Sequence, residues 1–364
     1  MTALEQGKIS SAQIIFLVVG FGLGTSVILQ PGGGAKQDAW LAIILGLAEG
    51  IGIAMIYLAL ANRFPGRTLI QINDLVWGPY LGKVFSAAFL LFVFHLGSLV
   101  ITNAKDFIQF VALIYTPASV SVLFEVLICI IAAAAGLEVM GRSAVVLVIF
   151  VASTLFIMDL LLLPRFVMSN LKPVLETPLP QLILEGHAAA TFPFGETVVF
   201  TMLIPFLKNT EKSRSSMIAG LVFAGLLLVT SSIRNIGVLG ATAGYYIYPS
   251  YSVSHLINVG EVFTRLEALA GINFLITVFI KLSILLYVFM LGTAQLLRLK
   301  SYRTLAIPVW ILISLAGTHN FSNVVVNLIA AKKLWPIYTL PFEVGIPLFT
   351  WLAALIRKLP REAS

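Results

Sequence analysis

Long apolar stretches alternate with short polar joints along the whole chain. Each stretch has roughly 20 residues, which is enough for a helix to cross the hydrocarbon core of a bilayer. Alternating strands of about ten residues, the pattern of a membrane β-barrel, do not occur. The pattern therefore predicts an all-α polytopic membrane protein. We place ten spans at about 10–31, 39–61, 82–111, 119–140, 143–163, 189–208, 215–239, 268–297, 304–329 and 336–357.

The order of these spans predicts an inverted repeat. Ten spans divide into five and five, at about 10–163 and 189–357, and an odd number of spans per half inverts the second half relative to the first. This is the architecture of leucine-transporter-like carriers, whose first and sixth helices are broken near the bilayer midplane. No joint is long enough for a soluble domain, so we expect a single integral membrane domain.

Breaks are predicted at matching positions of the two halves. Span one contains Gly20, Gly22 and Gly24, followed by Thr25 and Ser26. Span six contains FPFGE, which combines a helix breaker, a glycine and an acid in residues 192–196. Taken singly, the glycines are also typical of close helix packing, and the proline of a simple kink. Their matching positions favour two broken helices.

A pair of broken helices offers a binding site for a small zwitterion. The freed N–H groups of one half-helix suit a carboxylate, and freed carbonyls suit a cation. An α-amino acid is the simplest ligand of this kind. The hydroxyls of Thr25 and Ser26 add polar contacts, and Glu196 is an acid at membrane depth, where charge usually faces a cavity or a partner. A structural acid that ties helices together is the alternative for Glu196.

Other polar residues in the spans carry weaker predictions. Lys281 lies deep in span eight and either acts as a built-in cation for ion or proton coupling or pairs with an acid such as Glu196. His95 and Ser98 share a helix face in span three, although an interior hydrogen-bonded histidine is the favoured interpretation. Glu49 lies between Gly46 and Gly50, a spacing typical of helix packing. Four acids near span ends or alone receive no role: Glu125, Glu138, Asp159 and Glu343.

Composition and charge support this picture and narrow the function. The 364 residues are 59% hydrophobic and 11% charged, whereas soluble domains are about a quarter charged. The net charge of +7 is spread over short joints, which indicates topology determinants and not a nucleic-acid surface. The joints on the N-terminal side of the membrane carry more than twice as many Lys and Arg as the opposite joints, so both termini are expected in the cytoplasm.

An enzymatic role is not expected. Four dispersed histidines and one cysteine, Cys129, give no metal set, and one cysteine allows no intrachain disulfide. A phosphate-binding Gly-rich loop is missing, as is a clustered nucleophile and base. We therefore predict no catalytic residue, no metal and no cofactor.

Several motifs resemble those of one family. In order along the chain they are QDAW (Gln37–Trp40), FPG (Phe64–Gly66), FPFGE (Phe192–Glu196), Tyr248-Pro249, RLEAL (Arg265–Leu269) and Lys281. This order resembles the spore germination permeases, the B subunits of nutrient germinant receptors in endospore-forming bacteria. The likeness runs from about Lys8 to Lys358.

The resemblance implies the amino acid–polyamine–organocation transporter fold and a sensing role. It implies a multi-pass protein of the spore inner membrane or cell membrane that binds a small nutrient, often an amino acid, and works with A and C subunits. Matched residue by residue, the resemblance implies that the ligand pocket proposed for the family lies in three places in this sequence. These are the segment Gly20–Ser26, which includes Phe21, the pair His95 and Ser98, and the residues Phe194, Gly195 and Glu196. The expected function is thus a transporter-like germinant receptor subunit. A proton-coupled amino-acid permease, with Glu196 or Lys281 handling the proton, is the alternative, and a scaffold without a ligand is a third possibility.

Overall fold

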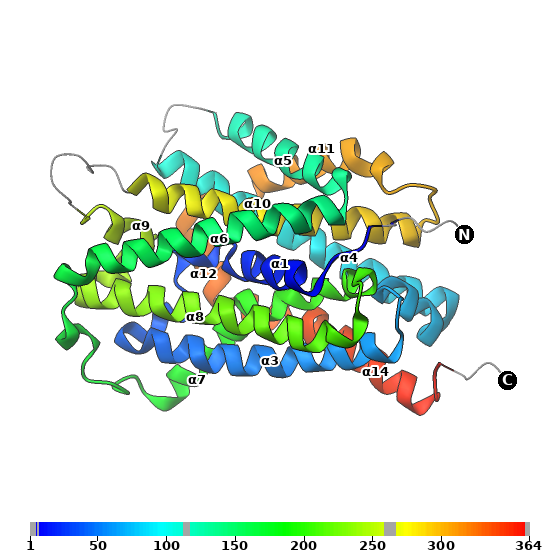
Figure 1. Cartoon of the computed structure of the whole chain (residues 1–364), viewed down its shortest axis with the longest axis horizontal. Helices are drawn as coiled ribbons and strands as arrows, with labels where there is room; N and C mark the ends of the chain where they lie inside the picture. The colour runs from blue at the N-terminus through cyan, green and yellow to red at the C-terminus, as the bar shows by residue number, and fades with distance from the viewer. Residues whose placement is uncertain (1–4, 6, 112–116, 258–266, 361–364) are drawn as a thin grey trace.

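Helices make up nearly all of the regular structure in the computed structural model, which describes residues 5, 7–111, 117–257 and 267–360. The long helices lie side by side along the longest axis of the molecule (Figure 1). The α-helices are α1 (Ser11–Leu23), α2 (Ser26–Leu29), α3 (Ala39–Arg63), α4 (Leu69–Val111), α5 (Ala118–Ala135), α6 (Leu137–Leu162), α7 (Leu179–Ala189), α8 (Ser213–Leu239), α9 (Pro249–Ser254), α10 (Glu267–Leu296), α11 (Ala306–His319), α12 (Val324–Lys333), α13 (Trp335–Tyr338) and α14 (Ile346–Ile356).

The predicted spans take three forms in the structure. Among the described residues, seven helical segments are long and apolar enough to cross a membrane. The predicted ninth span is instead a pair of helices, α11 and α12, bent by 97°. The predicted first and sixth spans fall below the length of an unbroken crossing helix because both are interrupted. The chain is therefore an all-α, multi-pass membrane protein in which the first and sixth spans are interrupted and the ninth is sharply bent.

The first break follows α1. A capping box begins this helix, with the Ser10 side chain accepting from the backbone of Gln13 and the Gln13 side chain accepting from Ser10. The helix ends at Gly24, whose φ of 27° lies in the region that favours glycine. A short helix, α2, resumes at Ser26. The alternating glycines of the sequence thus end a helix inside the apolar core, as predicted.

The second break lies in span six. After α7 the chain passes through a π-helical turn, η4 (Ala190–Phe194), in which Phe192 has extended dihedral angles (φ −125°, ψ 111°). Pro193 lacks an N–H group and cannot continue a regular helix. The chain then forms the 3₁₀ segments η5 (Gly195–Met202) and η6 (Ile204–Phe206).

Several predicted boundaries are wrong. Span six was expected from residue 189, but α7 begins at Leu179, because Pro178 and Pro180 are tolerated at the start of a helix. Span three was expected from residue 82. The helix α4 begins earlier, at Leu69, but it is kinked at Gly78, where φ is 82° and Pro79 follows, so its second part begins within a few residues of the predicted start. The fourth and fifth spans meet at Gly136, several residues earlier than expected.

The helix α10 is the centre of the bundle. In its most apolar stretch 78% of the residues are buried, against 28% in the peripheral α5. It packs against α1, α4, α5 and α6. Cys129 of α5 is buried at this contact, with its sulfur 3.9 Å from the Phe279 carbonyl of α10. Side chains of α10 therefore reach the broken first span directly.

The QDAW motif is hydrogen-bonded to the loop between α6 and α7. Asp38 is fully buried, and its carboxylate accepts hydrogen bonds from the backbone N–H groups of Leu175 (2.8 Å) and Thr177 (2.9 Å). Gln37 also contacts Glu176. The motif therefore ties the start of span two to the loop that leads into span six.

Both ends of the described chain lie at one end of the bundle (Figure 1). Ile9 donates its N–H to Phe206 and accepts from Lys208, at 3.0 and 2.9 Å. Near the other terminus, the guanidinium of Arg63 donates to the Leu359 carbonyl. This arrangement agrees with the ten crossings predicted from the sequence, because an even number of crossings returns the chain to the side on which it started.

The Tyr-rich segment between spans seven and eight is only partly described. Its short helix α9 packs against α2, α8 and α10, close to the first break. Residues 258–266, which include Arg265 of the RLEAL motif, lie outside the described residues.

Candidate functional site

A buried ion pair joins span eight to the second break. The Lys281 ammonium contacts the Glu196 carboxylate, and the side chains are 0% and 1% exposed. Glu196 lies on η5, directly after the break, and Lys281 lies on α10. Among the alternatives for Lys281, pairing with Glu196 is the arrangement observed.

The same ammonium also contacts both breaks through aromatic rings. Lys281 Nζ lies 5.1 Å from the ring centroid of Phe21, in the first span, and 5.1 Å from that of Phe192, in the second break. A cation over a ring face at this distance is attracted by the ring quadrupole, more strongly when water is excluded. Lys281 thus links the two broken spans as well as neutralising Glu196.

Hydroxyl groups satisfy the carbonyls freed at the first break. Ser26 Oγ lies 2.7 Å from the Gly22 carbonyl and 2.9 Å from the Leu23 carbonyl. Thr277 of α10 lies 2.8 Å from the Gly24 carbonyl. Thr25 differs, since its buried hydroxyl has no hydrogen-bond partner among the described residues. Sequence reasoning missed Thr277, because nothing in the apolar run of span eight distinguishes it from other small polar residues.

Close contacts leave little free space around the first break. A Cβ atom on Gly24 would lie 2.5 Å from Lys281 Cδ and 2.8 Å from the Phe21 carbonyl. A Cβ on Gly20 would lie 2.8 Å from the side chain of Ile280. The glycines therefore let α10 approach the broken span closely, and the site is closed in this arrangement.

A second buried acid lies beside the break in span six. A Cβ atom on Gly195 would collide with the carboxylate of Glu343, which comes from the π-helical turn η10 (Pro341–Gly345). Glu343 is 0% exposed, and neither of its carboxylate oxygens has a hydrogen-bond partner among the residues that the structure describes. The hydroxyls of Tyr57, on α3, and Thr197, on η5, lie 2.5 Å apart. The sequence showed Glu343 only as an isolated acid in an apolar run.

Two predicted site residues lie apart from the ion pair. His95 Nδ1 is 3.0 Å from the Tyr338 hydroxyl, and its ring packs against Trp335. Ser98 bonds to the His95 carbonyl and to Asn320. These contacts connect α4 to α11 and α13, and the described contacts of both residues do not include Glu196 or Lys281.

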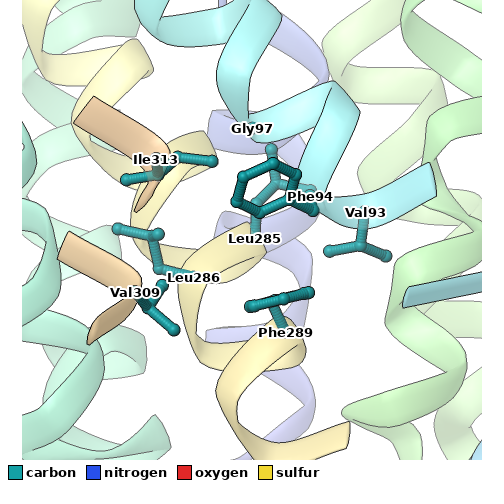
Figure 2. Close-up of a pocket in the computed structure, with 8 residues that line it drawn as sticks. All are labelled: Val93, Phe94, Gly97, Leu285, Leu286, Phe289, Val309 and Ile313. Carbon is teal, nitrogen blue, oxygen red and sulfur yellow. The ribbon is translucent and has the colours of Figure 1, made fainter. Parts of the chain in front are cut away.

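Figure 2 shows an apolar crevice among α4, α10 and α11. Its walls include Phe94, Leu285 and Ile313, and it is too narrow to admit a water molecule. It offers no polar group to a nutrient and does not reach Glu196. As for metals, the described residues contain no group of three His, Cys, Asp or Glu side chains that could hold an ion.

Comparison with known families assigns the chain. The family model described as spore germination protein matches residues 8–324. The chain belongs to this spore germination permease family. Germination protein KB of Bacillus subtilis (strain 168) is 27% identical over 369 residues, which cover 99% of this chain and 98% of that protein. Germination protein YndE of the same organism is 22% identical, over 80% of this chain and 82% of that protein.

Solved transporters share the fold of this family member. MHP1, a nucleobase-cation-symport transporter with bromovinylhydantoin bound, has a TM-score of 0.70 at 12% identity and covers 94% of this chain and 78% of its own. A Na⁺-coupled sialic acid symporter has a TM-score of 0.69 at 11% identity, with coverage of 96% and 90%. MhsT in complex with L-phenylalanine has a TM-score of 0.61 at 15% identity, with coverage of 97% and 99%. The leucine-transporter-like fold is thereby confirmed.

Proposed function

We propose that this chain is the transporter-like subunit of a spore nutrient germinant receptor and binds a small nutrient, most simply an amino acid, between the two broken spans. The observation that carries the proposal is the buried pair of Glu196 and Lys281, which connects both breaks within a transporter fold. A buried charge pair in a membrane protein is costly and is typical of a ligand or ion pathway.

Binding in this proposal is an exchange of partners. The closed site already holds one carboxylate and one ammonium, the two charged groups of an amino acid. A zwitterionic ligand entering between the breaks pairs its own groups with Lys281, with Glu196 and with the backbone of Gly20–Ser26, Phe194 and Gly195. It thereby separates α10 from span six. The ligand signals only because it binds the open and closed arrangements with different affinities.

The more distant residues take a supporting role. His95 and Ser98 lie on α4, which packs against α10 and α11. In this proposal α4 moves together with the site, and the two residues do not contact the charged pair itself. Under this proposal the protein works with A and C subunits in the spore inner membrane, with both termini in the cytoplasm.

Thr25 offers the sharpest test of the ligand site. Its hydroxyl is buried and unpartnered, so Thr25→Val removes no hydrogen bond of the closed protein. Purified protein in detergent is heated with the common L-amino acids, one at a time. At least one of them should raise the melting temperature of the wild type, since a ligand at 100 times its Kd stabilises by about 2.7 kcal/mol.

The variant comparison decides where the ligand binds. Thr25→Val should melt normally without ligand and lose at least half of the ligand-dependent shift. Ser314→Ala removes a similarly buried, unpartnered hydroxyl from α11 and should keep the full shift. A full shift in Thr25→Val contradicts the site, and a wild type that no amino acid stabilises contradicts ligand binding of this class.

A proton-coupled amino-acid permease is the second candidate. It is favoured by the solved transporters of the same fold, two of which are described as cation-coupled symporters. Liposomes with an imposed pH gradient separate the two functions. A permease accumulates labelled amino acid inside the liposomes, whereas a sensor binds the amino acid without uptake.

A further inference from the structure

The carboxylate of Glu343 is buried without a partner in the middle of a membrane span. Glu343 lies within the crossing segment Trp335–Ile356 and is 0% exposed, and in the described part of the chain neither of its oxygens has a partner within hydrogen-bonding distance. The Thr339 hydroxyl, one turn earlier, is also fully buried and acts on this carboxyl, although it lies within hydrogen-bonding distance of no partner among the described residues. An ionised carboxylate without a counter-charge or hydrogen bonds is strongly disfavoured in such a place.

The charged groups around Glu343 do not supply that counter-charge. The groups that act on it from the packed elements are Glu196 of η5, Lys281 of α10, and Glu49 and Tyr57 of α3. Glu49 is paired with His187, at 2.6 Å. Lys281 is the one cation among these groups, and it already contacts Glu196. Two fully buried acids therefore lie near a single ammonium, and that ammonium is paired with Glu196.

We propose that Glu343 is a proton-binding site, protonated in this closed arrangement, and that its proton is released when the broken spans separate. A neutral carboxyl balances the charge of the site, because Glu196 and Lys281 then cancel. The carboxyl of Glu343 touches the backbone at Gly195, so movement of span six uncovers it to water.

Loss of the proton favours the open arrangement. An ionised Glu343 competes with Glu196 for Lys281 and so weakens the contact that holds α10 to span six. The closed arrangement binds the proton more tightly than the open one, so raising the pH disfavours closure. Ligand binding that opens the pair should release a proton, and ligand affinity should rise with pH by up to roughly tenfold per unit. This linkage rests on the proposed function, whereas the proton-binding site itself does not.

Infrared spectroscopy tests the proton-binding site without a ligand. At pH 7 the wild type should show the C=O stretch of a neutral carboxylic acid that Glu343→Gln lacks. Glu138→Gln removes an exposed acid paired with Arg142 and should leave that band unchanged. If Glu343→Gln removes no neutral carboxyl band, the proposal is overturned.

Proton release tests the linkage on the wild type directly. In weakly buffered solution, the amino acid that stabilises the protein should release about one proton per bound molecule, and Glu343→Gln should release none. Glu125→Gln removes another buried, unpartnered acid, on α5, and should retain the release. Proton release that persists in Glu343→Gln, or a wild type that binds ligand without release, overturns the linkage. If the infrared band is present but no amino acid binds, the proposed function fails while the proton site stands.

Discussion

Lys281 holds three parts of the protein together through one ammonium. It neutralises Glu196 and contacts the rings of Phe21 and Phe192. Lys281→Met keeps the length of the side chain but leaves Glu196 as an unpaired buried acid. Removing one partner of such a pair typically costs about 3–5 kcal/mol. We expect a strong drop in melting temperature, measured with purified protein.

A matched set of variants separates charge from packing. The double variant that combines Lys281→Met with Glu196→Gln removes both charges. It should recover a large part of the stability that the single variant Lys281→Met loses. Arg142→Ala breaks an exposed pair with Glu138 and should cost about 1 kcal/mol or less. If the single and double variants melt alike, the loss of stability in Lys281→Met does not come from an unpaired charge on Glu196.

At the residue scale, the sequence predicted part of the site. Glu196 was identified because an acid beside Pro and Gly in a span is unusual, and Lys281 because a lysine deep in a span needs a partner. Glu343 could not be placed, because its neighbours in sequence do not show that Gly195, about 150 positions earlier, leaves room for its carboxyl. Which polar residues meet depends on how the spans pack.

At the scale of elements, the glycines of α3 form the surface on which span six rests. A Cβ on Gly46 would lie 2.6 Å from the Cβ of Ala189, and one on Gly50 would collide with Phe194. Gly52, on the same helix, has open space around it. The packing interpretation of this spacing is therefore supported, and Glu49 is satisfied by His187.

Alanine substitutions along α3 should therefore change the stability of the protein in opposite directions, depending on the glycine replaced. Gly46→Ala and Gly50→Ala push α3 away from the break and should each cost about 1–3 kcal/mol. Gly52→Ala should be neutral or stabilise by up to about 1 kcal/mol, since alanine favours helix. Melting temperatures of the three variants give the comparison. Equal effects at positions 50 and 52 would contradict the close contact with Phe194.

The number and type of elements were more predictable than their ends. Apolar runs locate the spans, because a bilayer demands a minimum helix length. The start of α7 at Leu179 was missed because its first two turns contain a proline and polar residues and so do not read as part of an apolar run. The bend between α11 and α12 was missed because the run is apolar on both sides of it. The hydrophobicity of a segment indicates that it is buried in lipid or protein, but it says little about the direction in which the helix axis runs.

At the scale of the whole molecule, the N-terminal segment fastens one end of the bundle. Glu5 accepts hydrogen bonds from the hydroxyls of Tyr287 (3.2 Å) and Tyr302 (3.1 Å), while Ile9 bonds to Phe206 beyond the second break. The segment thus connects span eight, the following joint and the end of span six. Opening on this side must break these contacts.

Tyr302→Phe should loosen this end without affecting the ion pair. Hydrogen exchange at the Ile9 amide should become faster, with little change in melting temperature, because one hydrogen bond contributes about 1 kcal/mol. Burial and the Glu5 carboxylate raise the pKa of Tyr302 above the ordinary tyrosine value of about 10. The hydroxyl therefore keeps its proton, and its hydrogen bond, at neutral pH and loses it only when the pH rises above that raised pKa. Exchange protection at Ile9 that is unchanged in the variant would refute the fastening role.

The single thiol has a practical consequence for labelling chemistry. Cys129 is buried against α10, where no reagent reaches it while the bundle is intact. A thiol-reactive dye should therefore label the native chain slowly and the unfolded chain with a stoichiometry of one. The natural sequence, with no engineered cysteine, contains its own reporter of unfolding. Because Cys129 lies between α5 and α10, that reporter responds to the same helix that carries Lys281.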